Sequence, residues 1–404
     1  MAPLASCIEN RDVGPVGFIS AQWTNPSDIL SVLLLLGPDM VKKAIAQLAG
    51  RTITPIAFSF GWVGYAAKVL LSAFGRGLLD NLRLMPDTDL AGTLIISALS
   101  GQCMTTKNWI LGRLLRDEDD RFERERSLEQ NRSGEWVALS ITIYKWDDNP
   151  LLTPGVPKMD WVWYSGIVMI LVQLAVSAIP WILRGDWGVF LIASTGSLLA
   201  VTGASLPQWR QEKWGCPKTG GATIALTQGN GNQNVTVILG SRGFGLDLET
   251  LAQGIDTGAP TVFTKVISVI LALCWVALLI VVGGMKENTW YILGIGFLGS
   301  MQNLYAAGTA RHPSALGIHL KRVETIRAGK VAAALKQLEE KYPLVGTSLA
   351  PIFFPGSLRV KGDDLKFWHS ALQARMAPNK FGTRLDAIST FVGIESVGEY
   401  KAPA

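Results

Sequence analysis

Five long apolar stretches constrain the fold of this chain more than any other feature of its sequence. Each is long enough for a helix to cross a hydrocarbon core of roughly 30 Å, which takes about 20 residues. The charged-residue content of 17% is low beside the roughly 25% of an average soluble domain. We therefore expect an α-helical membrane bundle. The stretches are residues 54–75, 161–183, 187–207, 262–284 and 288–308.

Tryptophan and tyrosine concentrate at the ends of these stretches. Trp161 opens the second stretch and Trp181 closes it, Trp187 opens the third, and Trp290 and Tyr305 flank the fifth. Aromatic side chains of this kind are enriched where a membrane meets water. The pattern indicates a multi-pass protein and marks where its spans begin and end.

A sixth apolar segment, residues 28–50, differs from the other five. Gly37-Pro38-Asp39 interrupts it, and two lysines follow. We predict an interfacial or re-entrant helix here, after an N-terminal segment over residues 1–27. A sixth crossing is the alternative, so the chain has five or six transmembrane helices.

The lengths of the links determine which segments lie on the same side. Arg184-Gly185-Asp186 and Met285-Lys286-Glu287 are very short links, so residues 161–207 and 262–308 each form a two-span hairpin. The long segments then all lie opposite these links. They are an insertion at residues 76–160, a second insertion at residues 208–261 and a tail at residues 309–404.

Positive charge is concentrated on the long segments, whereas the short links carry only Arg184 and Lys286. The positive-inside rule therefore places the long segments in the cytosol. Lys42, Lys43 and Arg51 oppose this orientation, because they flank the first span on its external side. The basic residues of the long segments near the membrane are Arg76, Arg83, Lys158, Arg210, Lys213, Lys218, Arg311, Lys321 and Arg322.

Two glycosylation sequons begin at Asn131 and Asn234, in segments predicted to be cytosolic. We expect neither to be modified. The lipid bilayer is the partner that the composition implies, and the net charge of +5 is explained by the cytosolic face without a nucleic acid. The span lengths suit both the endoplasmic reticulum and the plasma membrane.

The first insertion contains the signals of a strand–helix–strand unit. Runs at residues 93–101 and 136–146 predict strands, and residues 107–126 predict the helix between them. In the second insertion, Gly229-Asn230-Gly231-Asn232 separates two further strand-like runs and predicts a hairpin. Because an isolated hairpin is marginal in water, we expect the two insertions to pair into one sheet.

Two more helices complete the predicted cytosolic α+β module. Residues 245–254 predict a short helix. Apolar positions from Leu320 to Leu338 predict an amphipathic helix over residues 318–341 in the tail.

An acidic run, Asp117-Glu118-Asp119-Asp120, is the densest cluster of potential ligands. Carboxylates bind hard cations through oxygen, so Asp117, Asp119 and Asp120 are the catalytic candidates for a magnesium–diphosphate site. A second acidic motif to face them is missing from the sequence. Interleaved arginines favour the alternative, a solvated helix face with ion pairs. We expect no metal and no cofactor.

Other motifs have simpler explanations. Lys68 inside the first stretch is an intramembrane charge, but it lies close enough to the end to reach the interface. Gln302 and Asn303 suit a polar ligand group or a bond to a neighbouring helix. The GIGFLG string from Gly294 to Gly299 lies inside a span, where glycines pack helices rather than bind a dinucleotide. The glycines of the segment LGSRGFGLD, residues 239–247, suit a phosphate loop or a plain connection.

Several blocks of the sequence occur together, among them TPIAFSFGWVGYA, NWILGRLLRD, GDWGVFL, LPQWRQEKW, KENTWYILGIGFLGSMQN and KYPLVGTSLAPIFFPG. Over most of residues 50–356 the chain resembles a largely uncharacterised family of filamentous-fungal multi-pass integral membrane proteins. The resemblance implies at most an accessory role linked to fungal secondary metabolism. It transfers no catalytic residue, and Lys68 stands where the family is expected to have an uncharged residue.

Three functional hypotheses follow. The first is an accessory membrane protein whose cytosolic module binds a protein partner or a ligand. The second is a membrane-embedded enzyme acting on a lipophilic small molecule, with Asp117, Asp119 and Asp120 as its candidates. The third is a small-molecule transporter, against which the sequence offers no inverted repeat and no pair of broken helices.

Overall fold

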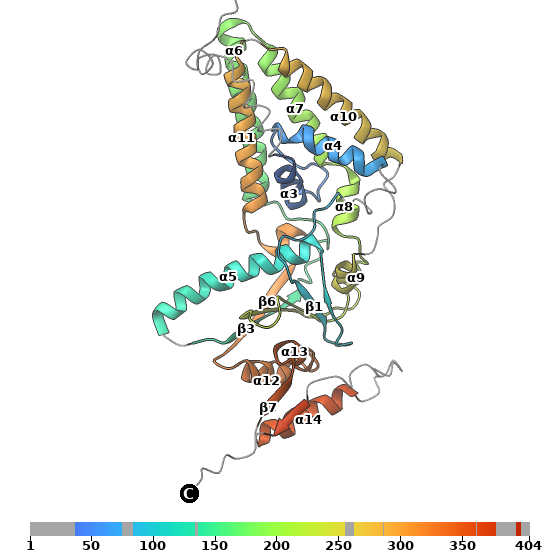
Figure 1. Ribbon diagram of the computed structural model, residues 1–404, viewed down its shortest axis with the longest axis vertical. Coiled ribbons are helices and arrows are strands. Elements are labelled where there is room, and N and C mark those ends of the chain that lie inside the picture. Colours follow the sequence, from blue (N-terminus) through green and yellow to red (C-terminus); the bar gives the residue numbers. More distant parts are fainter. Residues whose placement is uncertain are drawn as a thin grey trace, which may run out of the picture. The chain divides into compact units, whose positions relative to one another are not determined.

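The computed structural model of the chain divides into two compact units made of alternating segments (Figure 1). We call them the helical unit (Met1–Leu84, Trp161–Gln208 and Pro260–Thr309) and the sheet unit (Met85–Asp160, Trp209–Ala259 and Ala310–Ala404). The structure describes residues 37–74, 84–133, 136–254, 262–285, 287–360, 362–376 and 393–396.

The helical unit contains four long helices, α6 (Trp161–Arg184), α7 (Gly188–Ala204), α10 (Val262–Gly283) and α11 (Thr289–Gly308). Helix α6 packs on α7 and α11, and α10 packs on α7. Three helices of the described chain are long and apolar enough to cross a membrane, namely α6, α10 and α7 continued through α8 (Pro207–Lys213). This confirms helices of membrane length in the second, third and fourth apolar stretches. The fifth stretch forms α11, whose polar Gln302 and Asn303 lower its apolar character.

The first apolar stretch does not form the predicted helix over its whole length. Helix α4 (Gly61–Phe74) has 14 residues, and the chain from Thr54 to Phe60 is buried without being helical. Pro55 disfavours helical backbone at Thr54. Beyond it, Gln173 and Asn303 bond to the backbone groups of Phe58 and Ala57, which supports an extended chain there. The prediction of a span at residues 54–75 is therefore wrong for its first third.

The sixth apolar segment contributes a short helix, α3 (Pro38–Leu48), which begins with a proline in its first turn, where no amide hydrogen is needed. Residues 28–36 of this segment lie outside the described residues. Helix α3 packs on α4 and α11. With 11 residues it is too short to cross a bilayer alone.

The sheet unit contains a mixed six-stranded sheet of order β2-β1-β4-β5-β3-β6. Strands β3 and β5 are parallel, and the other neighbours are antiparallel. The pairing of β1 with β4 and of β3 with β5 joins the two insertions, as predicted, and β4–β5 is the predicted hairpin. The strands are β1 (Leu94–Ser97), β2 (Cys103–Thr105), β3 (Leu139–Trp146), β4 (Ile224–Thr227), β5 (Asn234–Ile238) and β6 (Leu320–Ala328).

The predicted helix at residues 318–341 is wrong in its first half. The chain forms β6, which pairs along the whole of β3, and turns helical only in α12 (Val331–Lys341). Val323, Thr325 and Ile326 are β-branched and suit a strand. Gly329 follows the strand, and the helical apolar pattern begins after it. The predicted short helix at residues 245–254 is confirmed as α9 (Leu248–Gln253).

The two faces of the sheet differ in chemistry. Leu139, Ile141 and Ile143 of β3 enter an apolar core with α12, α13 (Val345–Phe353) and α14 (Asp363–Met376). A two-stranded parallel sheet of β7 (Ser357–Val360) and β8 (Gly393–Ser396) adjoins this core through its buried apolar residues in β7. The alternate residues of β3 and β5 are mostly polar, and they face the long helix α5 (Trp109–Ser133).

Candidate functional site

Helix α5 carries the acidic run and positions every candidate residue in it. The side chain of Asn108 accepts hydrogen bonds from the amides of Ile110 and Leu111 and so fixes where the helix begins. Its first half is anchored by buried Ile110, Leu111, Leu114 and Leu115. Consecutive acidic residues are turned by about 100° on a helix, so the four carboxylates meet different surroundings.

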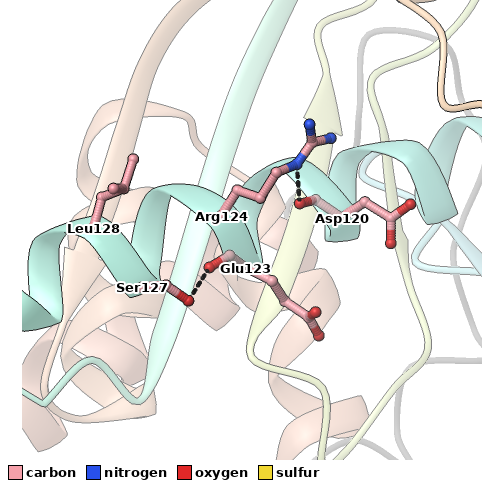
Figure 2. A pocket seen from close by; sticks show the side chains of 5 residues that line it. All are labelled: Asp120, Glu123, Arg124, Ser127 and Leu128. Carbon is pink, nitrogen blue, oxygen red and sulfur yellow. Dashed lines mark hydrogen bonds between the residues drawn. The ribbon is translucent and has the colours of Figure 1, made fainter.

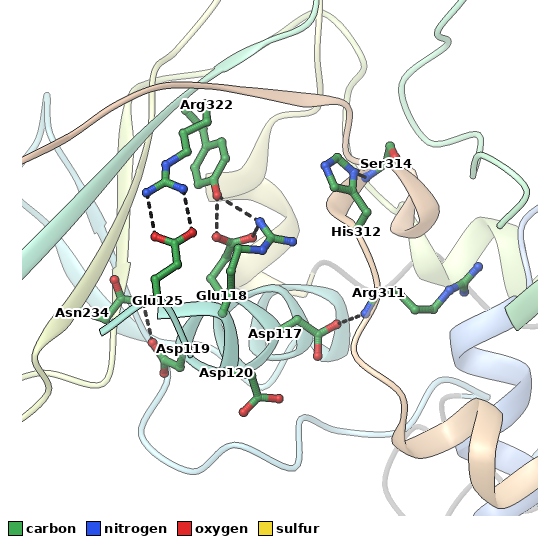
Figure 3. Close-up of polar contacts among 12 residues, drawn as sticks. Asp117, Glu118, Asp119, Asp120, Glu125, Asn234, Arg311, His312, Ser314 and Arg322 are labelled. Carbon is green, nitrogen blue, oxygen red and sulfur yellow. Dashed lines mark hydrogen bonds and ion pairs between the residues drawn. The ribbon is translucent and has the colours of Figure 1, made fainter. Parts of the chain in front are cut away.

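Asp117 is buried in an ion-pair cluster. Its carboxylate lies 3.1 Å from the Arg113 guanidinium and accepts a hydrogen bond of 3.0 Å from the backbone amide of Arg311 (Figure 3). Arg311 in turn forms a bidentate pair with Asp160 at 2.6 and 2.7 Å. Burial raises the pKa of Asp117, and Arg113 opposes this shift. These contacts tie α5 to the segments that precede α6 and follow α11.

Buried Glu118 belongs to a second polar network, which Figure 3 shows beside β6. It accepts hydrogen bonds from the Tyr144 hydroxyl at 2.5 Å and from Arg121 at 2.7 Å. Two turns further along α5, Glu125 forms a bidentate pair with Arg322 of β6 at 2.9 and 3.1 Å. Burial raises the pKa of Glu118, and burial together with the Glu118 charge raises the pKa of Tyr144. The network joins α5 to both β3 and β6.

Asp119 faces the start of β5. It accepts a hydrogen bond of 2.7 Å from the Asn234 side-chain amide, and burial raises its pKa to about 6. Asn234 is the asparagine of the second sequon and is itself buried, so the folded chain presents no acceptor at that position. Ser140 and Thr236 on the same polar face have buried hydroxyls that form no hydrogen bond with the described residues.

Asp120 points away from the sheet. With Glu123, Arg124, Ser127 and Leu128 it lines an open depression of about 630 Å³ on the outer side of α5 (Figure 2). Arg124 donates to the backbone oxygen of Asp120, not to its carboxylate. Neither Asp120 nor Glu123 forms an ion pair with a residue that the structure describes.

The structure does not bring the three predicted aspartates together. Asp117, Asp119 and Asp120 have separate surroundings, and among the described residues no three His, Cys, Asp or Glu side chains are grouped to hold a metal ion. The alternative of a solvated helix face is wrong for Asp117 and Glu118, which are buried. Catalysis by these aspartates stays a prediction.

A buried lysine escaped the sequence analysis. Lys213, predicted to be a basic residue beside the membrane, is fully buried, with its ammonium 4.9 Å from the ring centre of Trp214 and 5.8 Å from that of Trp109. Burial and the nearby Arg311 lower its pKa well below the usual value. The signal available in the sequence was a lysine between tryptophans, a pattern typical of cation–π contacts.

The polar residues of the helical unit bond to neighbouring segments. Lys68 forms an ion pair of 2.6 Å with Asp39 of α3, and both side chains are more than half exposed. Gln302 donates to Ser165 of α6, and Asn303 donates to Ser59 in the non-helical segment before α4. The interpretation as a residue that bonds to a neighbouring helix is confirmed for Gln302, whereas the partners of Asn303 lie in a non-helical segment.

The glycine motifs are also packing features. A β-carbon at Gly296 or Gly299 would collide with Phe60 or with the backbone of Phe58, which is why α11 has glycine there. Gly245 has a positive φ of 101° and lies against the Trp146 ring. These contacts favour close packing over dinucleotide or phosphate binding. Comparison of the chain with protein-family models, curated proteins and solved structures finds no match.

Proposed function

We propose that the protein is an accessory multi-pass membrane protein whose sheet unit is a cytosolic binding module for a partner protein. Helices α6, α7, α10 and α11 cross the bilayer in two hairpins. Their short links lie on one side, and all segments of the sheet unit follow from the opposite ends. In keeping with the family resemblance, we place this role in fungal secondary metabolism.

The exposed apolar surface of the helical unit supports the membrane assignment. Only 22% of the most apolar window of α6 and 28% of that of α10 is buried within the protein. Leu273 is 65% exposed and Ile182 is 78% exposed. A soluble protein rarely presents so continuous an apolar surface to water, whereas lipid solvates it. Helix α11 has 20 residues, which span about 30 Å.

The observation that carries the binding proposal is the outer face of α5, which we call the α5 outer face: Asp120, Glu123, Arg124, Ser127 and Leu128. It combines the open depression with Leu128, whose side chain is 68% exposed, and with two carboxylates that have no ion-pair partner among the described residues. An apolar anchor beside unpaired negative charge suits a basic amphipathic helix.

A defined peptide tests this proposal. A synthetic amphipathic helix of leucine and lysine is expected to bind the purified protein, and the same peptide with glutamate in place of lysine is not. Asp120→Lys with Glu123→Lys should weaken binding of the basic peptide about fourfold or more, at about 0.2–1 kcal/mol for each of two lost attractions and a similar cost for each of two new repulsions.

The matched control is Asp148→Lys with Asp363→Lys, which makes the same change of net charge at two exposed positions away from the α5 outer face. Unchanged affinity in the α5 variant would show that the peptide does not bind at the α5 outer face. An equal loss in the control would show that the binding is non-specific attraction to negative charge. A photo-cross-linker at Ser127 then identifies the natural partner in cells.

One observation favours the transporter as a second candidate. The segment between α3 and α4 interrupts helical structure inside the bundle, and such interruptions form substrate sites in many transporters. Uptake or efflux measured in vesicles tests this role, and a null result across lipophilic small molecules retires it. For the enzyme hypothesis, simultaneous replacement of Asp117, Asp119 and Asp120 by alanine without loss of product formation would exclude those residues.

A further inference from the structure

We infer that residues 49–74 form a re-entrant element that enters the membrane and leaves it on the side of the long segments, without crossing. The inference rests on the proposed function, in which α6, α7, α10 and α11 cross the bilayer. The ends and midpoints of these helices then show how deep a neighbouring residue lies in the membrane. It concerns the first predicted span and corrects the direction in which the chain passes there.

The element begins level with the ends of α7 and α11 that lead into the long segments. The backbone amide of Thr54 donates to the hydroxyl of Ser205, the residue that follows α7, at 3.0 Å. The side chain of Gln47 donates to the backbone oxygen of Thr309, the residue that follows α11, at 3.1 Å. Residues 47–54 therefore lie at that surface of the helical unit.

The chain then descends to the middle of the bundle. Phe58 donates its backbone amide to the side chain of Gln173 at 3.2 Å, and its backbone oxygen accepts from the same side chain at 2.8 Å. Gln173 lies halfway along α6. A β-carbon at Gly299, halfway along α11, would lie 1.7 Å from the Phe58 oxygen, and one at Gly196, halfway along α7, would lie 2.7 Å from its ring. Three helices thus place Phe58 at mid-depth.

From Phe58 the chain turns back. Trp62 packs on Gly203, close to the end of α7 where the element began. Within the helical unit, Figure 1 shows α3 and α4 in the half remote from the two short links. Entry and exit therefore lie on the same side.

The bundle compensates for the missing helical hydrogen bonds. An unpaired backbone group in hydrocarbon costs several kcal/mol, so irregular chain at this depth needs protein partners. Gln173 satisfies both backbone groups of Phe58, and the Trp62 indole and the Asn303 amide donate to the backbone oxygen of Ala57. The Trp275 ring is stacked between those of Phe58 and Trp62, with ring centres 6.0 and 5.8 Å apart.

The inference removes a conflict in the charge distribution. With a crossing at residues 54–75, Arg51 would lie on the external side, against the positive-inside rule. With a re-entrant element, Arg51 lies on the same side as the long segments and their basic residues. After residue 49 the chain then crosses four times, not five.

Cysteine labelling tests the inference in the full-length protein. In a background with serine at Cys7, Cys103, Cys216 and Cys274, single cysteines replace Leu151 on a long segment, Trp187 at a short link, and Ile53, which is 58% exposed. A membrane-impermeant maleimide is added to either face of sealed vesicles. Labelling in detergent establishes that each cysteine is present and reactive.

We expect Ile53→Cys to react from the same face as Leu151→Cys, and Trp187→Cys to react from the other. Reaction of Ile53→Cys from the same face as Trp187→Cys overturns the re-entrant element. It leaves the proposed crossing of α6, α7, α10 and α11 intact. Reaction of Leu151→Cys and Trp187→Cys from the same face overturns the proposed crossing of the four helices, and with it this inference. Protection of Ile53→Cys and also Arg51→Cys from both faces overturns it as well, because the entry would lie too deep.

Discussion

Replacing Gln173 by leucine should destabilise the helical unit strongly. The two side chains are similar in size, so the change removes hydrogen bonds with little change of volume. Gln173 is fully buried, and its amide makes bonds of 2.8–3.2 Å with both backbone groups of Phe58 and one of 2.8 Å with the backbone oxygen of Ile295. Phe58 lies outside a helix, so its two groups have no alternative partner in the helical ladder.

The expected cost follows from those two groups. A buried donor or acceptor that loses its partner costs about 1–3 kcal/mol, so Gln173→Leu should reduce the free energy of unfolding by about 2–6 kcal/mol. Ordinary side-chain hydrogen bonds between membrane helices are worth only about 0.6 kcal/mol on average. The two estimates are far enough apart for one measurement to separate them.

The assay is reversible unfolding in mixed micelles with sodium dodecyl sulfate, followed by tryptophan fluorescence and far-ultraviolet circular dichroism. Ser177→Ala is the matched control, because Ser177 is also buried in α6 but donates to Leu174 in its own helix. Its expected loss is below about 1 kcal/mol. A loss for Gln173→Leu no larger than that of the control would refute the claim that Gln173 supports the non-helical segment.

Two further predictions concern the sheet unit. Asp119 has a pKa raised to about 6, so between about pH 4 and pH 6 the folded state holds its proton more tightly than the unfolded state does. The free energy of unfolding should therefore fall by up to about 3 kcal/mol as the pH rises through that window. The Asp119→Asn variant should lack this part of the fall. If the free energy of unfolding changed with pH in parallel in the two proteins, the prediction would be contradicted. Buried Arg375 bonds to the backbone oxygens of Leu344 and Ala98 and to the Thr347 hydroxyl at 2.8–3.0 Å. Arg375→Ala should cost about 3 kcal/mol or more and speed hydrogen exchange in α14, and unchanged exchange there would contradict this role.

The apolar pattern predicted most of the helices because burial in lipid or protein needs long runs of apolar residues whatever their neighbours are. It failed at residues 54–60, where composition is as apolar as in a span but Pro55 and the partners Gln173 and Asn303 favour extended chain. Those partners are more than 100 residues away in the sequence. Local periodicity carries no information on them.

The strands were predictable for a similar reason, and their order was not. β-branched alternation identified β1, β3 and the β4–β5 hairpin, whereas β6 was assigned to a helix. Its exposed edge residues, such as Lys321 and Arg322, give a pattern that suits a helix equally well. Pairing with β3, which decides the matter, is a tertiary contact.

The acidic run shows why candidate sites are harder to predict than elements. Four adjacent carboxylates suggested one site, but a helix turns each residue in another direction, and each then meets partners from distant segments. Asp117 meets Arg311, Glu118 meets Tyr144 and Asp119 meets Asn234. Of the four, only Asp120 lies on the α5 outer face, where we propose that the partner protein binds.

The central claim is that four helices cross the membrane and carry a cytosolic sheet unit. The most direct test is to measure on which side of the membrane the short links and the long segments lie. A flexible loop with a glycosylation sequon, long enough to reach the glycosylating enzyme, is inserted after Gly185 in one protein and after Leu151 in another. We predict a glycosidase-sensitive mass shift for the Gly185 insertion and none for the Leu151 insertion or for the native sequons at Asn131 and Asn234. Modification at Leu151 or at Asn131 would contradict a cytosolic sheet unit carried by four crossing helices.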